Sequence, residues 1–143
     1  MRVLHLGVGG GAVIAFLITG QLMRHHTPPM AAMSDSARLM LRSRHIYILA
    51  AALVNLVLGV YLQRQGKGWR RVVQAAGSAF LIASPVLLVL AFAAEPRRGF
   101  QQEMPWSHAG LYALFAGSIA HLVCGPVRSK KSLPGRPAPG MPR

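Results

Sequence analysis

The chain contains four apolar runs, each about as long as a helix that crosses a lipid bilayer. They cover approximately 3–23, 46–63, 72–94 and 106–124. A helix needs roughly 20 apolar residues to span the hydrocarbon core, because it rises about 1.5 Å per residue. A strand interpretation fails, since the runs do not alternate with a period of two and are too long for the strands of a membrane barrel. The sequence therefore predicts an all-α membrane protein with four transmembrane helices in an up-down bundle.

The composition supports a membrane protein over a soluble one. Hydrophobic residues make up 52% of the chain and charged residues only 13%, against roughly 25% charged residues in an average globular protein. The 16 Lys and Arg far outnumber the 3 Asp and Glu, and they lie almost entirely between or after the apolar runs. Anionic lipid headgroups attract cations at those positions. Nucleic-acid binding is not predicted, because no basic face is interleaved with aromatic residues.

The longest connection, 24–45, begins with a proline pair that stops a helix. Its second part, SDSARLMLRSRH, predicts a short amphipathic helix between the first two spans. Ser34 or Ser36 is its candidate cap, and Arg38 and Arg42 fall on one face. This helix either lies on the membrane surface or extends the second span outward.

The remaining organisation is simple: one transmembrane domain over 1–124 and a basic, Pro- and Gly-rich tail over 125–143. Four spans place both termini on one side, together with ten of the 16 Lys and Arg. The positive-inside rule then predicts cytoplasmic termini in a bacterial-type inner membrane. The candidate contacts for anionic lipid or for a partner protein are Arg38, Arg42, Arg128, Lys130 and Lys131.

Small residues recur every four positions within the spans, a spacing that lets membrane helices approach closely. Asn55 lies near mid-membrane, where an unpaired amide is costly, so we expect it to point into the bundle and bond a neighbouring helix. The predicted packing residues are Gly7, Gly11, Ala15, Asn55, Gly59, Ala113 and Gly117, with a further stripe at Ala75, Ala79 and Ala83 in the third span. The stripes are consistent with packing inside the bundle or against other subunits.

Four histidines near the span ends form the constellation with the clearest chemistry. His5 and His121 fall near one membrane face, and His45 and His108 fall near the other. Two imidazoles from facing helices can ligate a haem b iron axially, so each pair is a candidate haem site. The alternative is a set of interfacial or hydrogen-bonded histidines. No metal site and no catalytic motif is predicted, and the single Cys124 excludes an internal disulfide.

Three short segments carry a family resemblance. They are Leu4-His5 in the first span, Arg24-His25-His26 at its end, and MLRSRH (40–45) before the second span. On these, the chain resembles the small four-helix membrane proteins of the HemJ type, which are implicated in protoporphyrinogen oxidation. It lacks the lysine that this family's pattern places in the third span. The resemblance implies haem as a cofactor to test.

The leading functional hypothesis is non-catalytic. No carboxylate lies inside an apolar run, because Asp35, Glu95 and Glu103 are all in connecting segments. An intramembrane protease or proton-coupled transporter usually needs such a group at depth. We therefore predict an accessory or assembly subunit that packs against another membrane protein or against itself. The alternative is a b-type haem protein or membrane oxidoreductase with bis-histidine ligation.

Overall fold

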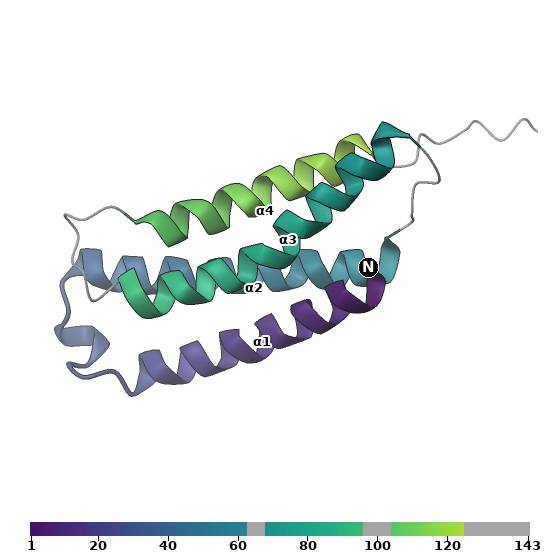
Figure 1. Cartoon of the computed structure of the whole chain (residues 1–143). Helices are drawn as coiled ribbons and strands as arrows, with labels where there is room; N and C mark the ends of the chain where they lie inside the picture. The colour runs from purple at the N-terminus through teal and green to yellow at the C-terminus, as the bar shows by residue number, and fades with distance from the viewer. Residues whose placement is uncertain (63–67, 96–103, 125–143) are drawn as a thin grey trace, which may run out of the picture.

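The computed structural model describes residues 1–62, 68–95 and 104–124. Its elements are α1 (Arg2–Arg24), a short 3-10 turn η1 (Met30–Ala32), α2 (Asp35–Tyr61), α3 (Trp69–Ala94) and α4 (Pro105–Val123). Each α-helix runs antiparallel to the preceding one, so the bundle has the predicted up-down order (Figure 1). The described residues form helices and turns and contain no strand.

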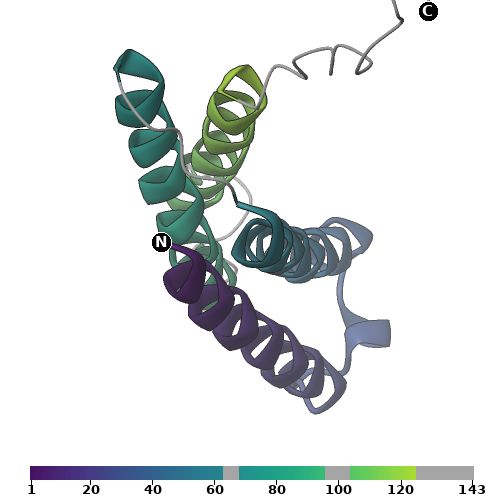
Figure 2. The same cartoon turned by 90° about the vertical axis from the view of Figure 1, so that its right-hand side faces the viewer.

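The bundle is built from two helix pairs. α1 packs along α2, α3 packs along α4, and α2 also packs against α3 (Figure 2). The apolar core lies where α2, α3 and α4 meet, and its buried residues are Ile48, Ala51, Leu81, Leu88 and Leu114.

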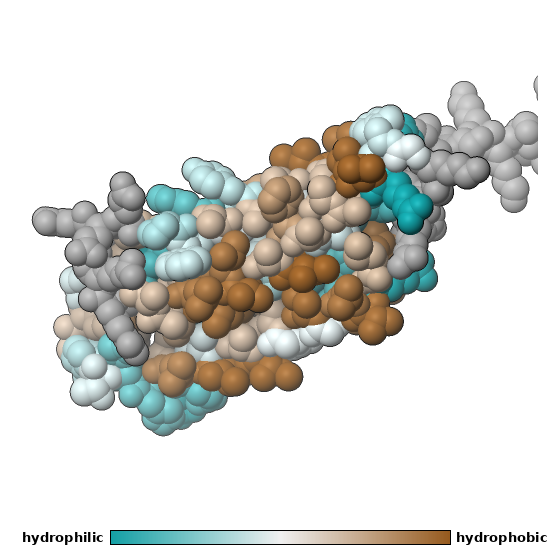
Figure 3. Space-filling view, in the orientation of Figure 1, coloured by the Kyte–Doolittle hydropathy of each residue, from teal (hydrophilic) through white to brown (hydrophobic). Residues whose placement is uncertain are grey.

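Three of the four helices, α1, α2 and α3, are long and apolar enough to cross a membrane. α4 falls short, because its 19 residues include two histidines and the polar first turn that begins PWSH. Many large apolar side chains of all four helices are exposed. In the view of Figure 3 they gather over the middle of the surface, while hydrophilic residues lie mainly toward its two ends. That distribution fits a hydrocarbon environment and not water.

The segment after η1 differs from the prediction of a separate amphipathic helix. It forms the first part of α2, which runs without interruption from Asp35 to Tyr61. Ser34 is the cap, since its hydroxyl accepts a hydrogen bond from the Ala37 amide at 3.4 Å. No glycine or proline stands between Ser34 and the second apolar run, so the backbone has no cause to break there. The alternative in which this segment extends the second span is the one observed.

The predicted small-residue stripe of α1 does not face the interior of the bundle. Gly7 and Gly11 are exposed, and a Cβ added at either would meet no atom within 4 Å. The buried glycine is Gly9, where an added Cβ would lie 2.9 Å from the Leu56 amide nitrogen. The polar residues explain this rotation, because His5 and Thr19 share the Gly9 face and both bond α2.

The same holds for the small-residue stripe of α3. The predicted stripe of Ala75, Ala79 and Ala83 is exposed, whereas Gly77, Ser78, Leu81 and Ser84 are buried. The serines face inward because each hydroxyl bonds α4, with Ser84 donating to the Gly110 carbonyl at 2.9 Å. Polar side chains, not alanine spacing, therefore set the orientation of this helix.

On α2 and α4 the small residues do lie at helix contacts. An added Cβ at Gly59 would stand 3.0 Å from the Leu6 amide nitrogen of α1. One at Gly117 would stand 2.7 Å from the Gly77 carbonyl oxygen of α3, and Ala113 is also buried. The backbones of α3 and α4 approach so closely that only glycine fits.

Candidate functional site

The candidate site is a polar cluster inside the bundle to which all four helices contribute. His5 of α1, Asn55 of α2, Ser78 of α3 and His121 of α4 meet near the end of the bundle that holds the N-terminus. His5, Asn55 and Ser78 are fully or almost fully buried. Polar groups at such depth in a membrane bundle are costly unless paired, so this convergence marks a site of structural or chemical importance.

Asn55 fixes the protonation pattern of His5. The amide nitrogen of Asn55 donates to the Leu81 carbonyl at 2.8 Å and to the Ala51 carbonyl at 2.9 Å. Its amide oxygen therefore faces His5 and lies 2.7 Å from Nδ1. Because that oxygen can only accept, the His5 Nδ1 carries the proton and donates it. In the neutral ring, Nε2 then bears a lone pair.

Among the described residues, that second nitrogen of His5 has no hydrogen-bond partner. His5 is 0% exposed, and its Nε2 is buried. Buried imidazole nitrogens are normally paired, so an unpaired one requires an explanation such as an ion or another ligand. His5 is thus a fully buried imidazole whose free lone pair is held in place by Asn55.

The second histidine of the cluster lies beside the first. The ring centroids of His5 and His121 are 6.2 Å apart, and the ring planes stand at 81°. Nε2 of His121 lies 3.1 Å from the Ser78 hydroxyl. This ring lies against Gly77 of α3, because a Cβ there would come within 3.3 Å of His121 Cδ2. The predicted pair of His5 and His121 is therefore brought together.

The other predicted pair, His45 and His108, is not brought together. His45 turns toward α1, where its Nδ1 lies 2.9 Å from the Thr19 hydroxyl and its ring stacks on Phe16 at 4.0 Å. His108 is exposed on α4 and stacks on Tyr112. The two rings face different surroundings and do not form one site.

At the opposite end of the bundle lies a buried ion pair that sequence reasoning missed. Nη2 of Arg44 lies 2.7 Å from Oε2 of Glu95, and both residues are 2% exposed. Ser107 joins them, because its backbone amide donates to Glu95 Oε1 at 2.9 Å and its hydroxyl bonds Oε2. Nε of Arg44 donates to the same hydroxyl at 3.1 Å. These contacts fasten α2 to the end of α3 and the start of α4.

The acid dependence of stability should report on this ion pair. Burial alone would raise the pKa of Glu95, but the two Ser107 hydrogen bonds and the Arg44 charge outweigh it and lower that pKa below its ordinary value of 4.5. A lowered pKa contributes stability above the unfolded-state pKa and loses it as pH falls through the folded-state value. We expect the stability of the protein in detergent to decrease as the pH falls below about 4.5. A Glu95→Gln variant that kept the full acid dependence would contradict this assignment.

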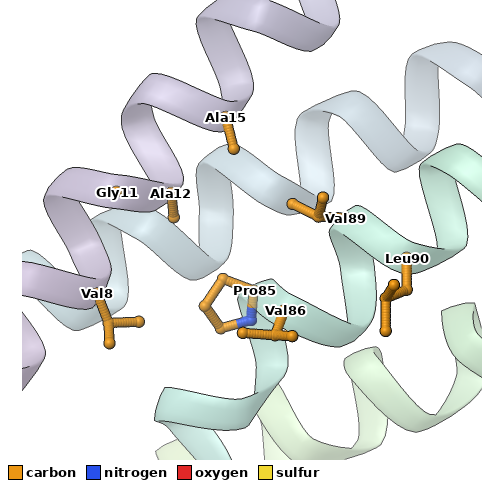
Figure 4. A pocket seen from close by; sticks show the side chains of 8 residues that line it. All are labelled: Val8, Gly11, Ala12, Ala15, Pro85, Val86, Val89 and Leu90. Atoms are coloured by element: carbon orange, nitrogen blue, oxygen red, sulfur yellow. The ribbon is translucent and has the colours of Figure 1, made fainter.

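An apolar groove opens between α1 and α3. Its cavity measures about 340 Å³, and Figure 4 shows its lining residues on the two helices. α1 contributes Val8 and three small residues, and α3 contributes Pro85, two valines and Leu90. α3 bends part-way along its length (Figure 1), as expected for a helix with an internal proline.

The predicted surface cations fall into two groups. Arg38 pairs with Asp35 on the first turn of α2, and Arg42 is exposed. Arg128, Lys130 and Lys131 lie outside the described residues.

Cys124 is buried at the end of α4. Within the described parts of the chain, no group of three or more His, Cys, Asp or Glu side chains is placed to hold a metal ion.

Comparison with known proteins does not assign the chain to a family. No protein-family model matches the chain, and no curated protein or solved structure is significantly similar to it.

Proposed function

We propose that this chain is an accessory subunit that receives a transmembrane helix of another membrane protein in the groove between α1 and α3. The observation that supports this most directly is the empty space above Gly7 and Gly11, where an added Cβ would meet nothing within 4 Å. Gly11 and Ala15 also line the groove. Gly7, Gly11 and Ala15 form a small-xxx-small repeat on an outward face, the pattern that admits a second helix backbone.

The groove suits a helix better than it suits lipid alone. Apolar attraction between helices is weak in hydrocarbon, so association depends on close backbone approach and dispersion contacts. Glycine permits that approach, and Cα–H···O contacts add to it. Ala79 and Ala83 of α3 are exposed on the same helical face as Val86, which lines the groove. Small residues thus border the groove on both helices.

The membrane topology is part of the proposal. α4 has 19 residues and spans roughly 28 Å at 1.5 Å per residue, close to the hydrocarbon thickness of about 30 Å. Its antiparallel packing along α3 favours a fourth crossing. Both termini would then lie on one side, and the excess of cations on that side favours the cytoplasmic face of an inner membrane.

Leucine substitutions on α1 test the docking face. Gly11→Leu should abolish association with the partner, because the side chain would occupy the space proposed for the incoming helix. Gly10→Leu is the matched control, since a Cβ at Gly10 also meets nothing within 4 Å but points about 100° away around the helix. The measurement is site-specific photocrosslinking from α1 in native membranes, followed by mass spectrometry of the product.

A crosslinked heteromeric product of fixed stoichiometry that is lost in Gly11→Leu and kept in Gly10→Leu is the expected result. A product made only of this chain would replace the proposal with a homo-oligomer. Equal loss in both variants, or none in either, would contradict docking on this face.

Haem ligation by His5 and His121 stays a prediction that this packing does not favour. A porphyrin between the rings needs an open slot in front of a ligating nitrogen, and Nε2 of His5 is covered by protein atoms.

A further inference from the structure

We propose that His5 and His121 form a two-histidine site for a single monovalent metal ion, with Cu(I) as the biological case. This site is distinct from the α1–α3 groove and does not depend on the accessory role. The observation that carries it is the buried Nε2 lone pair of His5, for which the described part of the chain offers no partner. Its ring centroid lies 6.2 Å from that of His121.

The spacing of the rings matches a shared ion. An imidazole nitrogen lies about 2 Å from a metal that it ligates, so two rings on opposite sides of one ion have centroids about 6 Å apart. The rings of His5 and His121 are separated by that distance. An ion that bonds both nitrogens would also satisfy the buried lone pair of His5.

The supporting hydrogen bonds are those of a metal-binding pair. A histidine that ligates through one nitrogen usually donates its other N–H to a nearby acceptor, which fixes the tautomer and the ring orientation. Asn55 accepts from Nδ1 of His5, and Ser78 lies within hydrogen-bond distance of Nε2 of His121. With those hydrogen bonds in place, the proposed ligating atoms are Nε2 of the first ring and Nδ1 of the second.

The charge of the site selects the ion. None of the four cluster residues carries a carboxylate, and the described acidic side chains, Asp35 and Glu95, lie at the other end of the bundle. A divalent ion would bring two uncompensated charges into a low-dielectric interior, which is strongly unfavourable. A monovalent ion brings only one uncompensated charge. Among the metals that imidazole binds well, which are Zn, Cu, Fe and Ni, copper has a stable monovalent state.

Cu(I) titration of the full-length protein in detergent, with a chromophoric Cu(I) chelator as competitor, tests the proposal. We expect one Cu(I) per chain. His5→Ala and His121→Ala should each weaken binding more than about 100-fold, and Asn55→Ala by about 10–100-fold through loss of ring orientation. His45→Ala and His108→Ala are the matched controls and should bind as the unsubstituted chain does. X-ray absorption of the loaded protein should show two nitrogen ligands and no sulfur.

Several outcomes overturn the proposal. They are no bound Cu(I), unchanged binding in the His121→Ala variant, a sulfur ligand, or Zn²⁺ bound as tightly as Cu(I). His121 is only partly buried, so its variant tests the site even if His5→Ala fails to fold. Hemin titration provides the remaining arm, because a Soret band that disappears in His5→Ala but not in His45→Ala would assign the pair to haem instead.

Discussion

Replacing Glu95 with glutamine is expected to lower the free energy of unfolding in detergent by about 3 kcal/mol. The substitution preserves shape but leaves the Arg44 guanidinium buried without its counter-charge. Breaking a buried pair from one side typically costs about 3–5 kcal/mol. We expect the lower end, because the glutamine oxygen can still accept from the Ser107 amide. Denaturant unfolding followed by circular dichroism measures the change.

A double substitution separates the pair from the individual residues. Arg44→Met combined with Glu95→Gln removes the unpaired charge while keeping an apolar stem of similar length, so stability should recover to within about 1 kcal/mol of the original. Asp35→Ala is the control, because it removes the exposed pair with Arg38, and exposed pairs contribute little. If the double variant were as unstable as Glu95→Gln alone, the loss would not come from an uncompensated charge.

The sequence predicts the helical class and the helix positions well, because the length of each apolar run limits what it can form. α1 and α3 begin and end within three residues of the predicted spans. α2 begins earlier, since the sequence allowed two placements for its amphipathic segment and only the packed bundle selects the continuous helix. α4 is the exception. Its histidines lower its mean hydropathy, so length and composition do not establish that it crosses a membrane.

The rotation of each helix could not be read from spacing alone. Gly7 and Gly9 are both small, and the spacing of the small residues does not determine which of the two faces α2. His5 and Thr19 decide it, because their hydrogen bonds to Asn55 and His45 are worth more inside a bundle than the spacing of small residues. A sequence signal did exist, since His5 and Thr19 share the face of Gly9 at helical spacing.

The candidate site was predicted in part for a related reason. His5 and His121 were paired from their common membrane face, and the fold brings them together. Ser78 could not be identified, because its role depends on which helix lies beside α4. The Arg44–Glu95 pair was missed since both residues were assigned to connecting segments, although opposite charges at the same end of adjacent spans are a usable signal.

Glycine-to-alanine substitutions at Gly117 and Gly7 are expected to have effects of opposite sign. A Cβ at Gly117 would stand 2.7 Å from the Gly77 carbonyl oxygen and 2.6 Å from Leu81 Cγ. The first neighbour is backbone, so α3 and α4 must separate to admit the methyl group. Overpacking of this kind costs about 1–3 kcal/mol. Ala at Gly7 meets nothing within 4 Å and should stabilise the helix by about 0.5–1 kcal/mol through higher helix propensity.

The comparison tests the helix contacts without altering any polar group. Both substitutions add one methyl group to a glycine inside an α-helix, so helix propensity changes alike, and the difference in unfolding free energy reports the local space. The separation of α3 and α4 caused by Gly117→Ala should also move His121, because Gly77 holds its ring from the opposite helix. Cu(I) binding should therefore weaken in Gly117→Ala and remain unchanged in Gly7→Ala. Equal stability of the two variants would mean that α3 and α4 do not meet at Gly77 and Gly117.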